Sequence, residues 1–201
     1  FAAALAAFYA KIPVGHVEAG LRTYDRYSPF PEEINRNLTS KLATLHFAPT
    51  ELNRSNLAKE GITENVFVTG NTALDAFQYT VRQGYRFADE KLRSIDFSGK
   101  KVVALTAHRR ENQNGGIENI CNAVLELTRR HPELLFVYPV HLSPAVRKPV
   151  MSILADKPGV LLTDPVDVAD MHNLIAKSFF IMTDSGGIQE EAPSFHKPVL
   201  V

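Results

Sequence analysis

The sequence lacks several features that would assign it to a common class of protein. It has 201 residues but only one cysteine, Cys121, which excludes an internal disulfide framework and favours a reducing compartment. Cys121 falls within a helical pattern, where we expect a buried structural thiol. Lys and Arg together number 22, as do Asp and Glu, and the formal net charge is therefore zero. Because nucleic-acid-binding domains usually carry a basic excess or stripe, this balance disfavours that class.

Long apolar runs and common metal- or nucleotide-binding signatures are absent as well. No segment reaches the roughly 18 consecutive apolar residues that a membrane-spanning helix needs. The sequence contains no HExxH, no paired cysteines and no Asp/Asn-rich calcium loop, so no metal site is predicted. It also contains no GxxxxGK motif followed by Ser or Thr, and no GxGxxG fingerprint. A Walker-type NTPase and a standard dinucleotide dehydrogenase are therefore disfavoured.

Both ends of the sequence resemble interior positions of a longer chain. The run FAAALAAFYAK (1–11) has no basic region before it and leads into the strand-like IPVGHV, so we interpret it as a buried helix. No initiator Met and no capping residue precede this run. The last segment, KPVLV (197–201), is a β-branched run with no closing turn. We therefore expect an internal piece of a longer protein.

Strand and helix patterns alternate along the whole sequence. VVALTA (102–107), LLFVYPV (134–140) and FFIMT (179–183) are short, continuous apolar runs, which are typical of strands buried on both faces of a parallel sheet. We predict further strands at 13–17, 44–48, 66–69, 160–162 and 198–201, and helices at 2–11, 31–42, 50–60, 72–83, 117–130, 144–155, 167–176 and 187–192. The predicted fold class is α/β, with parallel sheets built from βαβ units.

A segment of mixed polarity divides this pattern into two halves. Residues 84–100 contain two glycines and show weak periodicity, as expected for a linker between domains. We predict two doubly wound, Rossmann-like domains, each only partly present. Residues 1–83 would form the C-terminal part of the first domain, and residues 101–201 would form the N-terminal part of the second.

Polar side chains gather where the predicted strands end. In open α/β sheets, ligands bind outside the carboxyl ends of the strands. This rule selects Glu18 and Arg22 after PVGHV, His108, Arg109 and Arg110 after VVALTA, His141 after LLFVYPV, and Asp184, Ser185, Gly186 and Gly187 after FFIMT. A ligand site is therefore expected among these residues.

The segment TDSGGIQEE (183–191) has the composition of an anion-binding turn. Gly186 and Gly187 lack Cβ atoms, so a phosphate can approach their backbone N–H groups at a helix start, and Ser185 adds a hydroxyl donor. Glu191 lies one helical turn further on, where its carboxylate could accept hydrogen bonds from both hydroxyls of a ribose. Most turns of this kind serve only packing, and a helix glutamate is usually solvated. The motif alone therefore leaves both alternatives open.

Histidine and arginine residues after the second set of strands are candidates for phosphate chemistry. His108 can donate a hydrogen bond or a proton to a leaving phosphate oxygen, and Arg109 suits bidentate phosphate recognition. We interpret Arg110 as a surface residue paired with Glu111. For His141, a functional and a structural role are equally supported.

Two carboxylates of the first half are candidates for proton transfer. Glu18 follows a buried strand and lies just before a glycine, an unusual place for an idle carboxylate. Glu32 and Glu33 follow Pro31 at a helix start, where carboxylates often serve only the helix dipole. Arg36, four residues after Glu32, offers it an ion pair. The pattern alone favours a structural role for Glu32 and leaves Glu18 open.

Four stretches together resemble a single enzyme family. They are PVGHVEAGLRTYDRYSPFPEEINR (13–36), TAHRREN (106–112), VYPVHLSPAVR (137–147) and MTDSGGIQEEAPSFHKPVLV (182–201). In this order and spacing, along almost the whole chain, they are similar to the non-hydrolysing UDP-N-acetylglucosamine 2-epimerases of bacteria. The resemblance implies a GT-B-like arrangement, with two Rossmann-like domains and an active site in the cleft between them, in a cytoplasmic homodimer.

The resemblance also implies a reaction, the interconversion of UDP-GlcNAc and UDP-ManNAc without NAD or a metal. The C2 proton is removed while UDP leaves C1, and UDP then returns to the bound glycal with the proton placed on the opposite face. By resemblance, Glu18 and Glu32 transfer the protons, with acid and base roles that can be exchanged. His108 assists at the diphosphate and the leaving group.

Binding roles follow from the same resemblance. By this resemblance, UDP is bound by Ser185, Gly186, Gly187 and Glu191, with Glu191 on the ribose. A second, regulatory UDP-GlcNAc pocket would be lined by Arg109 and His141. The family's N-terminal strand and a third catalytic aspartate would precede Phe1. His196 stands where many relatives have glycine, a loop change that we expect to be tolerated.

Three other functions are compatible with the same residues. A hydrolysing relative would release UDP and free N-acetylmannosamine, and a GT-B glycosyltransferase would require an acceptor. The chain could also bind UDP or a partner without turnover. The identity of the product discriminates among these functions, and none of them requires a nucleic-acid or membrane partner.

Overall fold

The computed structural model describes residues 1–109, 112 and 115–201, which form two compact units. The first unit comprises Phe1–Asp75 and the second comprises Ala76–Val201. Each unit is built on its own parallel sheet, as the alternating strand and helix pattern predicts. Across the described ranges, no helix is both long enough and apolar enough to cross a membrane.

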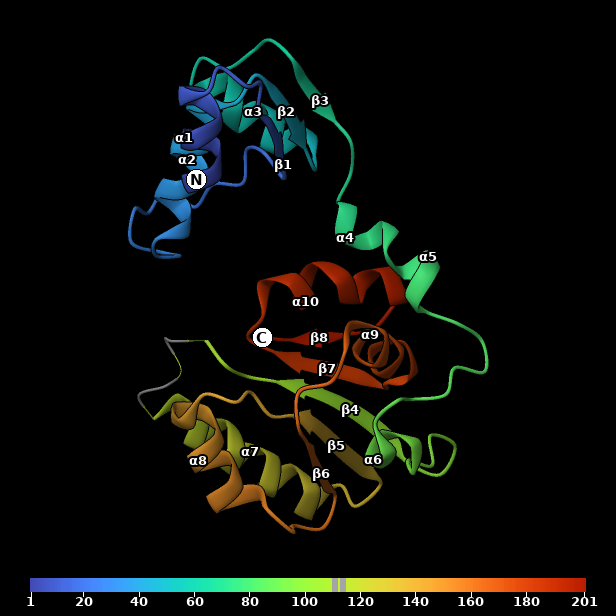
Figure 1. Cartoon of the computed structure of the whole chain (residues 1–201). Helices are drawn as coiled ribbons and strands as arrows, with labels where there is room; N and C mark the ends of the chain where they lie inside the picture. Colours follow the sequence, from blue (N-terminus) through green and yellow to red (C-terminus); the bar gives the residue numbers. More distant parts are fainter. Residues whose placement is uncertain (110–111, 113–114) are drawn as a thin grey trace. The chain divides into compact units, whose positions relative to one another are not determined.

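The first unit contains a three-stranded parallel sheet in the order β1-β2-β3 (Figure 1). Its strands are β1 (Gly15–Val17), β2 (Leu45–Ala48) and β3 (Val66–Val68), and its helices are α1 (Ala2–Tyr9), α2 (Glu32–Leu42), α3 (Glu51–Lys59) and α4 (Thr72–Asp75). The register places His16 beside His46. A capping box starts α3, because the Thr50 hydroxyl accepts from the Asn53 N–H and the Asn53 side chain accepts from the Thr50 N–H.

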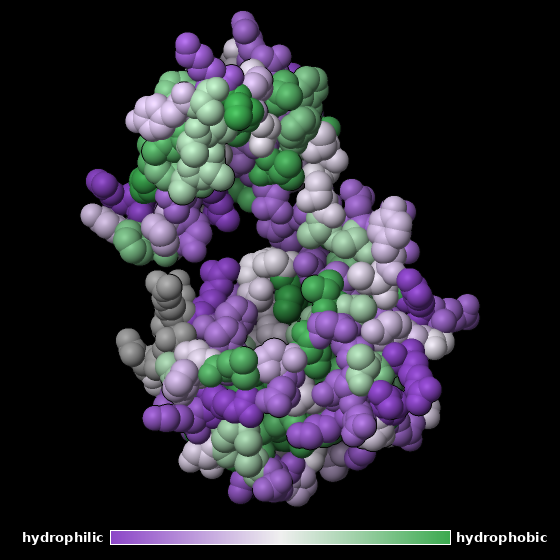
Figure 2. All heavy atoms as spheres, in the orientation of Figure 1, coloured by the Kyte–Doolittle hydropathy of each residue, from purple (hydrophilic) through white to green (hydrophobic). Residues whose placement is uncertain are grey.

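Several large apolar side chains of the first unit are exposed, and Figure 2 shows hydrophobic residues on the face of this unit that it draws. Phe8 and Tyr9 of α1 are 56% and 77% exposed, and Val17, Phe67 and Val68 of the sheet are also exposed.

The second unit contains a five-stranded parallel sheet in the order β6-β5-β4-β7-β8. Its strands are β4 (Lys101–Thr106), β5 (Leu134–Pro139), β6 (Val160–Thr163), β7 (Phe180–Thr183) and β8 (Val199–Leu200). Its helices are α5 (Phe77–Thr80), α6 (Glu90–Arg93), α7 (Gly116–Arg130), α8 (Pro144–Leu154), α9 (Val168–Lys177), α10 (Gly186–Glu191) and the 3₁₀ helix η2 (Ala192–Phe195).

Alternate residues of the central strands point to opposite faces of the second sheet. Val103 and Leu105 of β4 pack into one buried cluster with α7 and α8, whereas Val102 and Ala104 pack into another with α9. Figure 1 shows these helices on the two sides of the sheet. Because both faces are covered, every position from Val102 to Thr106 is buried. The buried strands predicted from continuous apolar runs are therefore confirmed.

Cys121 lies in α7 and is fully buried. Burial raises the pKa of its thiol to about 11, and the nearby Glu118 carboxylate adds to this shift. The thiol therefore stays protonated and packs as a small apolar group, as expected from its place in the helical pattern.

The helix predicted over 72–83 is broken into α4 and α5, and the boundary between the two units falls between them. Asn173 of α9 explains why α5 ends at Thr80. Its side-chain N–H donates to the Thr80 carbonyl over 2.7 Å, and its side-chain carbonyl accepts from the Arg82 N–H over 3.3 Å. A continuing helix would use these backbone groups for its own hydrogen bonds.

The segment 84–100, expected to be a linker after a first domain ending at residue 83, packs within the second unit instead. Phe87 and Leu92 are 4% and 0% exposed and belong to the core on the α9 face. The buried Asp170 carboxylate of α9 accepts hydrogen bonds from the Tyr85 hydroxyl and from the Ala88 and Asp89 N–H groups, each over 2.9 Å. The periodicity is weak because this segment is irregular, and backbone N–H groups in it donate hydrogen bonds to a side chain far away in the sequence.

Substitution of Asp170 tests this attachment. Asp170→Asn should lower the free energy of unfolding by about 1–3 kcal/mol, because the amide places donors against buried backbone donors. Asp164→Asn is the control, since Asp164 is 71% exposed and pairs with Arg147 at the surface, where an ion pair contributes about 0–1 kcal/mol. Denaturant unfolding measures both variants, and equal losses would contradict the structural role of Asp170.

Candidate functional site

Asp184 joins the ends of two neighbouring strands of the second sheet. β4 and β7 pair in parallel, so the residues that follow them leave the same edge of the sheet. The Asp184 carboxylate accepts hydrogen bonds from the N–H groups of His108 (2.9 Å) and Arg109 (2.8 Å) and from the Asn112 side chain (2.9 Å). Several N–H bonds to one carboxylate are charge-assisted and fix the loop that donates them. The structure therefore brings the predicted strand-end residues of β4 and β7 together.

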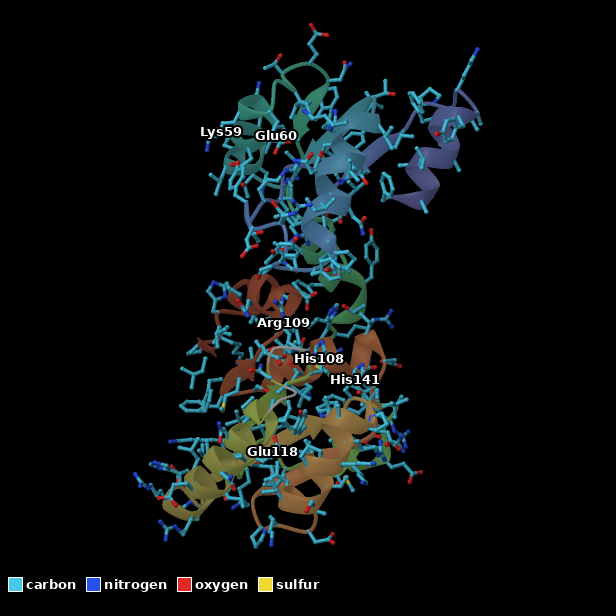
Figure 3. The ribbon with its side chains drawn as sticks, turned by 90° about the vertical axis from the view of Figure 1, so that its left-hand side faces the viewer. Lys59, Glu60, His108, Arg109, Glu118 and His141 are labelled. Atoms are coloured by element: carbon cyan, nitrogen blue, oxygen red, sulfur yellow. The ribbon has the colours of Figure 1, made fainter. Side chains whose placement is uncertain are left out.

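His108 and His141 lie side by side at this edge (Figure 3). Their rings stack with centroids 5.4 Å apart and an interplanar angle of 12°. Nδ1 of His108 lies 3.7 Å from Asp184. Nδ1 of His141 accepts from the Ser143 N–H over 3.1 Å, so the neutral ring carries its proton on Nε2. His141 therefore stabilises its own turn through the Ser143 N–H and also stacks on His108.

Arg109 lies against the start of α10. A Cβ built on Gly186 would lie 2.8 Å from Nη2 of Arg109, whereas one on Gly187 would meet nothing closer than the Ser185 hydroxyl at 3.9 Å. A side chain at position 186 would therefore displace the Arg109 guanidinium, whereas one at position 187 would not. The structure brings together Arg109, assigned by resemblance to a regulatory pocket, and Gly186, assigned to UDP binding.

Glu191 at the end of α10 is not a solvated helix residue. Its side chain is 18% exposed, and Oε2 lies 3.7 Å from Nε2 of His172 on α9. Burial raises the pKa of Glu191, and the charge of Glu190 adds to the shift. Sequence reasoning did not select His172, because the pair joins residues on two helices and no local motif marks it.

A small apolar cavity of about 150 Å³ lies beside the two stacked histidines. Its lining residues come from the ends of β4, β5 and β6, from α9 and from α10: Thr106, His108, Pro139, His141, Pro165, Val166, Met171 and Ile188. Sequence reasoning missed Pro165 and Val166. They follow β6 as His141 follows β5, so the strand-end rule could have found them.

Glu18 occupies a strained turn directly after β1 of the first unit. Its φ is +59°, a region that residues other than glycine rarely adopt, and its side chain is exposed. Gly20 anchors the turn to α3, because its carbonyl accepts from the side chains of Asn53 (3.3 Å) and Asn56 (3.1 Å). A Cβ on Gly20 would lie 2.1 Å from the Asn53 carbonyl oxygen, so only glycine fits. The turn that presents Glu18 is therefore fixed by its surroundings.

Glu32 and Glu33 differ in their environments, although they are neighbours in the first turn of α2. Glu33 is 5% exposed, and its carboxylate accepts from the Thr23 and Tyr24 N–H groups, each over 3.0 Å. Glu32 is exposed. Glu33 therefore fixes the loop that follows the Glu18 turn, while Glu32 remains accessible to a ligand. No local pattern distinguishes these two neighbouring carboxylates.

Arg22 points into the first unit. Its side chain is 1% exposed and forms a bidentate pair with Glu60, with Nε 2.7 Å from Oε1 and Nη2 3.0 Å from Oε2. Nη2 also donates to the Ser40 hydroxyl over 3.0 Å, and the same hydroxyl lies 3.3 Å from Nδ1 of His16. Of the strand-end residues, Arg22 is therefore structural. Figure 3 marks Glu60 at the end of α3.

Within the described residues, no group of three or more His, Cys, Asp or Glu side chains is arranged to hold a metal ion. Arg110 and its expected partner Glu111 lie outside the residues that the structure describes.

Comparison with known proteins assigns the family. Residues 1–201 match the family model described as UDP-N-acetylglucosamine 2-epimerase. The chain belongs to this epimerase family. The UDP-N-acetylglucosamine 2-epimerase of Bacillus subtilis is 52% identical over 203 residues, covering 100% of this chain and 52% of the relative.

Solved structures of relatives agree with this assignment. A structure of S. aureus MnaA with UDP has a TM-score of 0.93 at 53% identity, covering 100% of this chain and 54% of that one. The enzyme of Neisseria meningitidis bound to UDP-GlcNAc has a TM-score of 0.86 at 48% identity, covering 100% and 55%. This chain spans about half the length of these epimerases. The family resemblance and the GT-B-like α/β fold class are confirmed; the roles of individual residues stay predictions.

The partly buried His16 beside the Arg22 network predicts a pH dependence of stability. Burial, and then the charges of His46 and Arg22, lower the pKa of His16 from 6.5 to about 4. Between these values the unfolded chain binds more protons at this position, so the free energy of unfolding should fall as pH falls from 6.5 to 4. NMR titration of the His16 ring should give a midpoint near 4, and His16→Gln should remove this part of the pH dependence. A midpoint near 6.5 would contradict the burial of a neutral ring.

Asp184→Asn tests the anchoring of His108, Arg109 and Asn112 after β4. The amide accepts more weakly and turns N–H groups toward the loop's own N–H donors, so the loop should open more readily. Amide hydrogen exchange at His108 and Arg109 should accelerate by roughly tenfold or more, the equivalent of one lost charge-assisted hydrogen bond. Asp156→Asn, in the exposed turn after α8, is the control. Unchanged exchange in Asp184→Asn would show that other contacts hold the loop.

Proposed function

We propose that the full-length protein interconverts UDP-GlcNAc and UDP-ManNAc by elimination and re-addition of UDP through a bound glycal. The family assignment supports an epimerase, and relatives have been solved with UDP and with UDP-GlcNAc. The observation that carries the proposal is the cluster around Asp184, where His108, Arg109 and Gly186 meet at one edge of a parallel sheet. This is where an open α/β fold binds a nucleotide.

The second unit offers a group for each part of UDP. Ser185, Gly186 and Gly187 present a hydroxyl and uncrowded backbone to the diphosphate, with the Arg109 guanidinium against Gly186. Glu191 accepts from the ribose hydroxyls. The apolar cavity beside His108 suits a flat uracil ring.

Arg109 and His141 also stay our candidates for a second, regulatory UDP-GlcNAc pocket. Each lies directly beside a group of the proposed UDP site, Arg109 against Gly186 and His141 stacked on His108. A nucleotide sugar bound there would therefore influence the groups that hold UDP. By the same resemblance we propose a cytoplasmic homodimer without a cofactor, nucleic-acid partner or membrane partner.

The chemistry needs carboxylates for protons and donors for the departing diphosphate. A carboxylate takes the C2 proton, the C2–H electron pair becomes the C1–C2 double bond, and the C1–O bond breaks with its pair on UDP. His108 donates to the diphosphate as negative charge develops there. Re-addition reverses these steps with the proton delivered to the opposite face. We assign the two carboxylate roles to Glu18 and Glu32, whose side chains are exposed in the first unit. The cycle is redox-neutral, because the electrons of C2–H return to C2.

The decisive experiment follows UDP-GlcNAc by proton NMR in deuterium oxide with the full-length protein. UDP-ManNAc carrying deuterium at C2 is the expected product. Glu18→Gln and His108→Ala should each slow its formation by about 10²–10⁴-fold, the usual contribution of a proton-transfer group. Glu64→Gln is the matched control, because Glu64 is an exposed carboxylate in the loop before β3 and should leave turnover unchanged.

Other products would overturn the proposal. Free UDP with N-acetylmannosamine would identify a hydrolysing enzyme. An unchanged sugar with UDP still bound would leave a transferase or a binding protein. Full activity in Glu18→Gln would remove Glu18 from the proton-transfer roles while leaving the reaction in place.

A further inference from the structure

His172 is a buried polar residue that the proposed reaction does not use. It lies on α9 and is 6% exposed. Its Nδ1 is 2.8 Å from the Thr80 hydroxyl of α5, and its Nε2 faces Oε2 of Glu191 at 3.7 Å. The ring also packs edge-on against Phe77, with centroids 4.7 Å apart. His172 therefore joins the helix that begins the second unit to the carboxylate assigned to the ribose.

The Thr80 hydroxyl determines which ring nitrogen of His172 carries a proton. That hydroxyl has one hydrogen, which it donates to the Ala76 carbonyl over 3.0 Å. With that hydrogen on the Ala76 carbonyl, the hydroxyl accepts from Nδ1 of His172 over 2.8 Å. In the neutral ring the proton-free nitrogen is then Nε2, the nitrogen that faces Glu191.

At 3.7 Å, Nε2 of His172 and Oε2 of Glu191 are too far apart for a direct hydrogen bond, so the two groups interact through their charges. The pair is stable either as imidazolium with carboxylate or as neutral imidazole with carboxylic acid. Burial lowers the pKa of His172 and raises the pKa of Glu191, and the charge of Glu190 raises the latter further. From α5, Thr80 and Phe77 present no charge to the ring. A ribose that donates two hydrogen bonds to Glu191 favours the carboxylate and so moves the proton to His172.

We propose that His172 is a positioning residue for nucleotide recognition, which orients Glu191 and balances its charge so that the carboxylate can accept both ribose hydroxyls. This proposal rests on the proposed UDP site. The surrounding contacts prevent the ring from turning away: Thr80 holds Nδ1, and Phe77 packs on the ring and on Phe195, with 4.4 Å between the two phenyl centroids. Phe195 belongs to η2, which continues directly from Glu191.

The test compares UDP with 2′,3′-dideoxy-UDP by titration calorimetry on the full-length protein. The wild type should bind UDP at least tenfold more tightly, as expected for hydrogen bonds to a charged group. His172→Asn keeps a donor near the position of Nδ1 but removes the group that faces Glu191. It should weaken UDP by roughly tenfold and leave dideoxy-UDP almost unchanged, so that the preference collapses. His172→Gln places an amide donor near Nε2 and should retain most of the preference.

His196→Asn is the matched control. His196 is exposed and has φ +55°, a conformation that asparagine tolerates, so this variant should bind like the wild type. If His172→Asn weakens both ligands by the same factor, or neither, His172 is merely structural and the inference is overturned while the UDP site stands. If the wild type binds both ligands equally, Glu191 does not bind the ribose. If it does not bind UDP, the proposed function fails as well.

Discussion

The hydrogen bonds of Asp184 are the contacts on which the geometry of the second unit's site depends. One carboxylate at the end of β7 holds the loop after β4 by two backbone N–H groups and one side chain. This loop carries His108 and Arg109, and Arg109 in turn lies against Gly186 just after Asp184. An ionised carboxylate suits this position because it offers only acceptors and can satisfy several donors at once. The contact exists only because β4 and β7 are neighbours in the sheet.

Carboxylates stabilise irregular segments at three other places in the structure. Asp170 satisfies the backbone of 88–89, Glu33 satisfies that of 23–24, and Glu60 pairs with the buried guanidinium of Arg22. In each case a side chain on a helix or just after its end supplies acceptors to an irregular segment. These carboxylates support the loops and are at least partly buried, while Glu18 and Glu32 remain exposed and accessible to a substrate.

Regular elements were predictable wherever local pattern and burial agree. The helix predicted at 117–130 is α7, Gly116–Arg130, and the strand predicted at 102–107 is β4, Lys101–Thr106. The predictions for 72–83 and 84–100 differ from the structure for one reason. Asn173 and Asp170, both on α9, bind the backbone of these segments from more than 80 residues away in sequence. No local window contains the partner that ends α5 or that attaches 85–89 to the core.

The proposed site also combines features that local pattern predicts with features that depend on packing. The fold class and the strand ends that carry the proposed site follow from local sequence pattern, because a continuous apolar run followed by Gly, His or Asp reflects local periodicity and backbone freedom. Only the tertiary structure separated Glu33 from Glu32, turned Arg22 inward, stacked His141 on His108 and set His172 against Glu191. These outcomes depend on which helix faces which strand. The burial of a side chain and its hydrogen-bond partners on other elements depend on tertiary packing. The residues next to it in the sequence do not specify that packing.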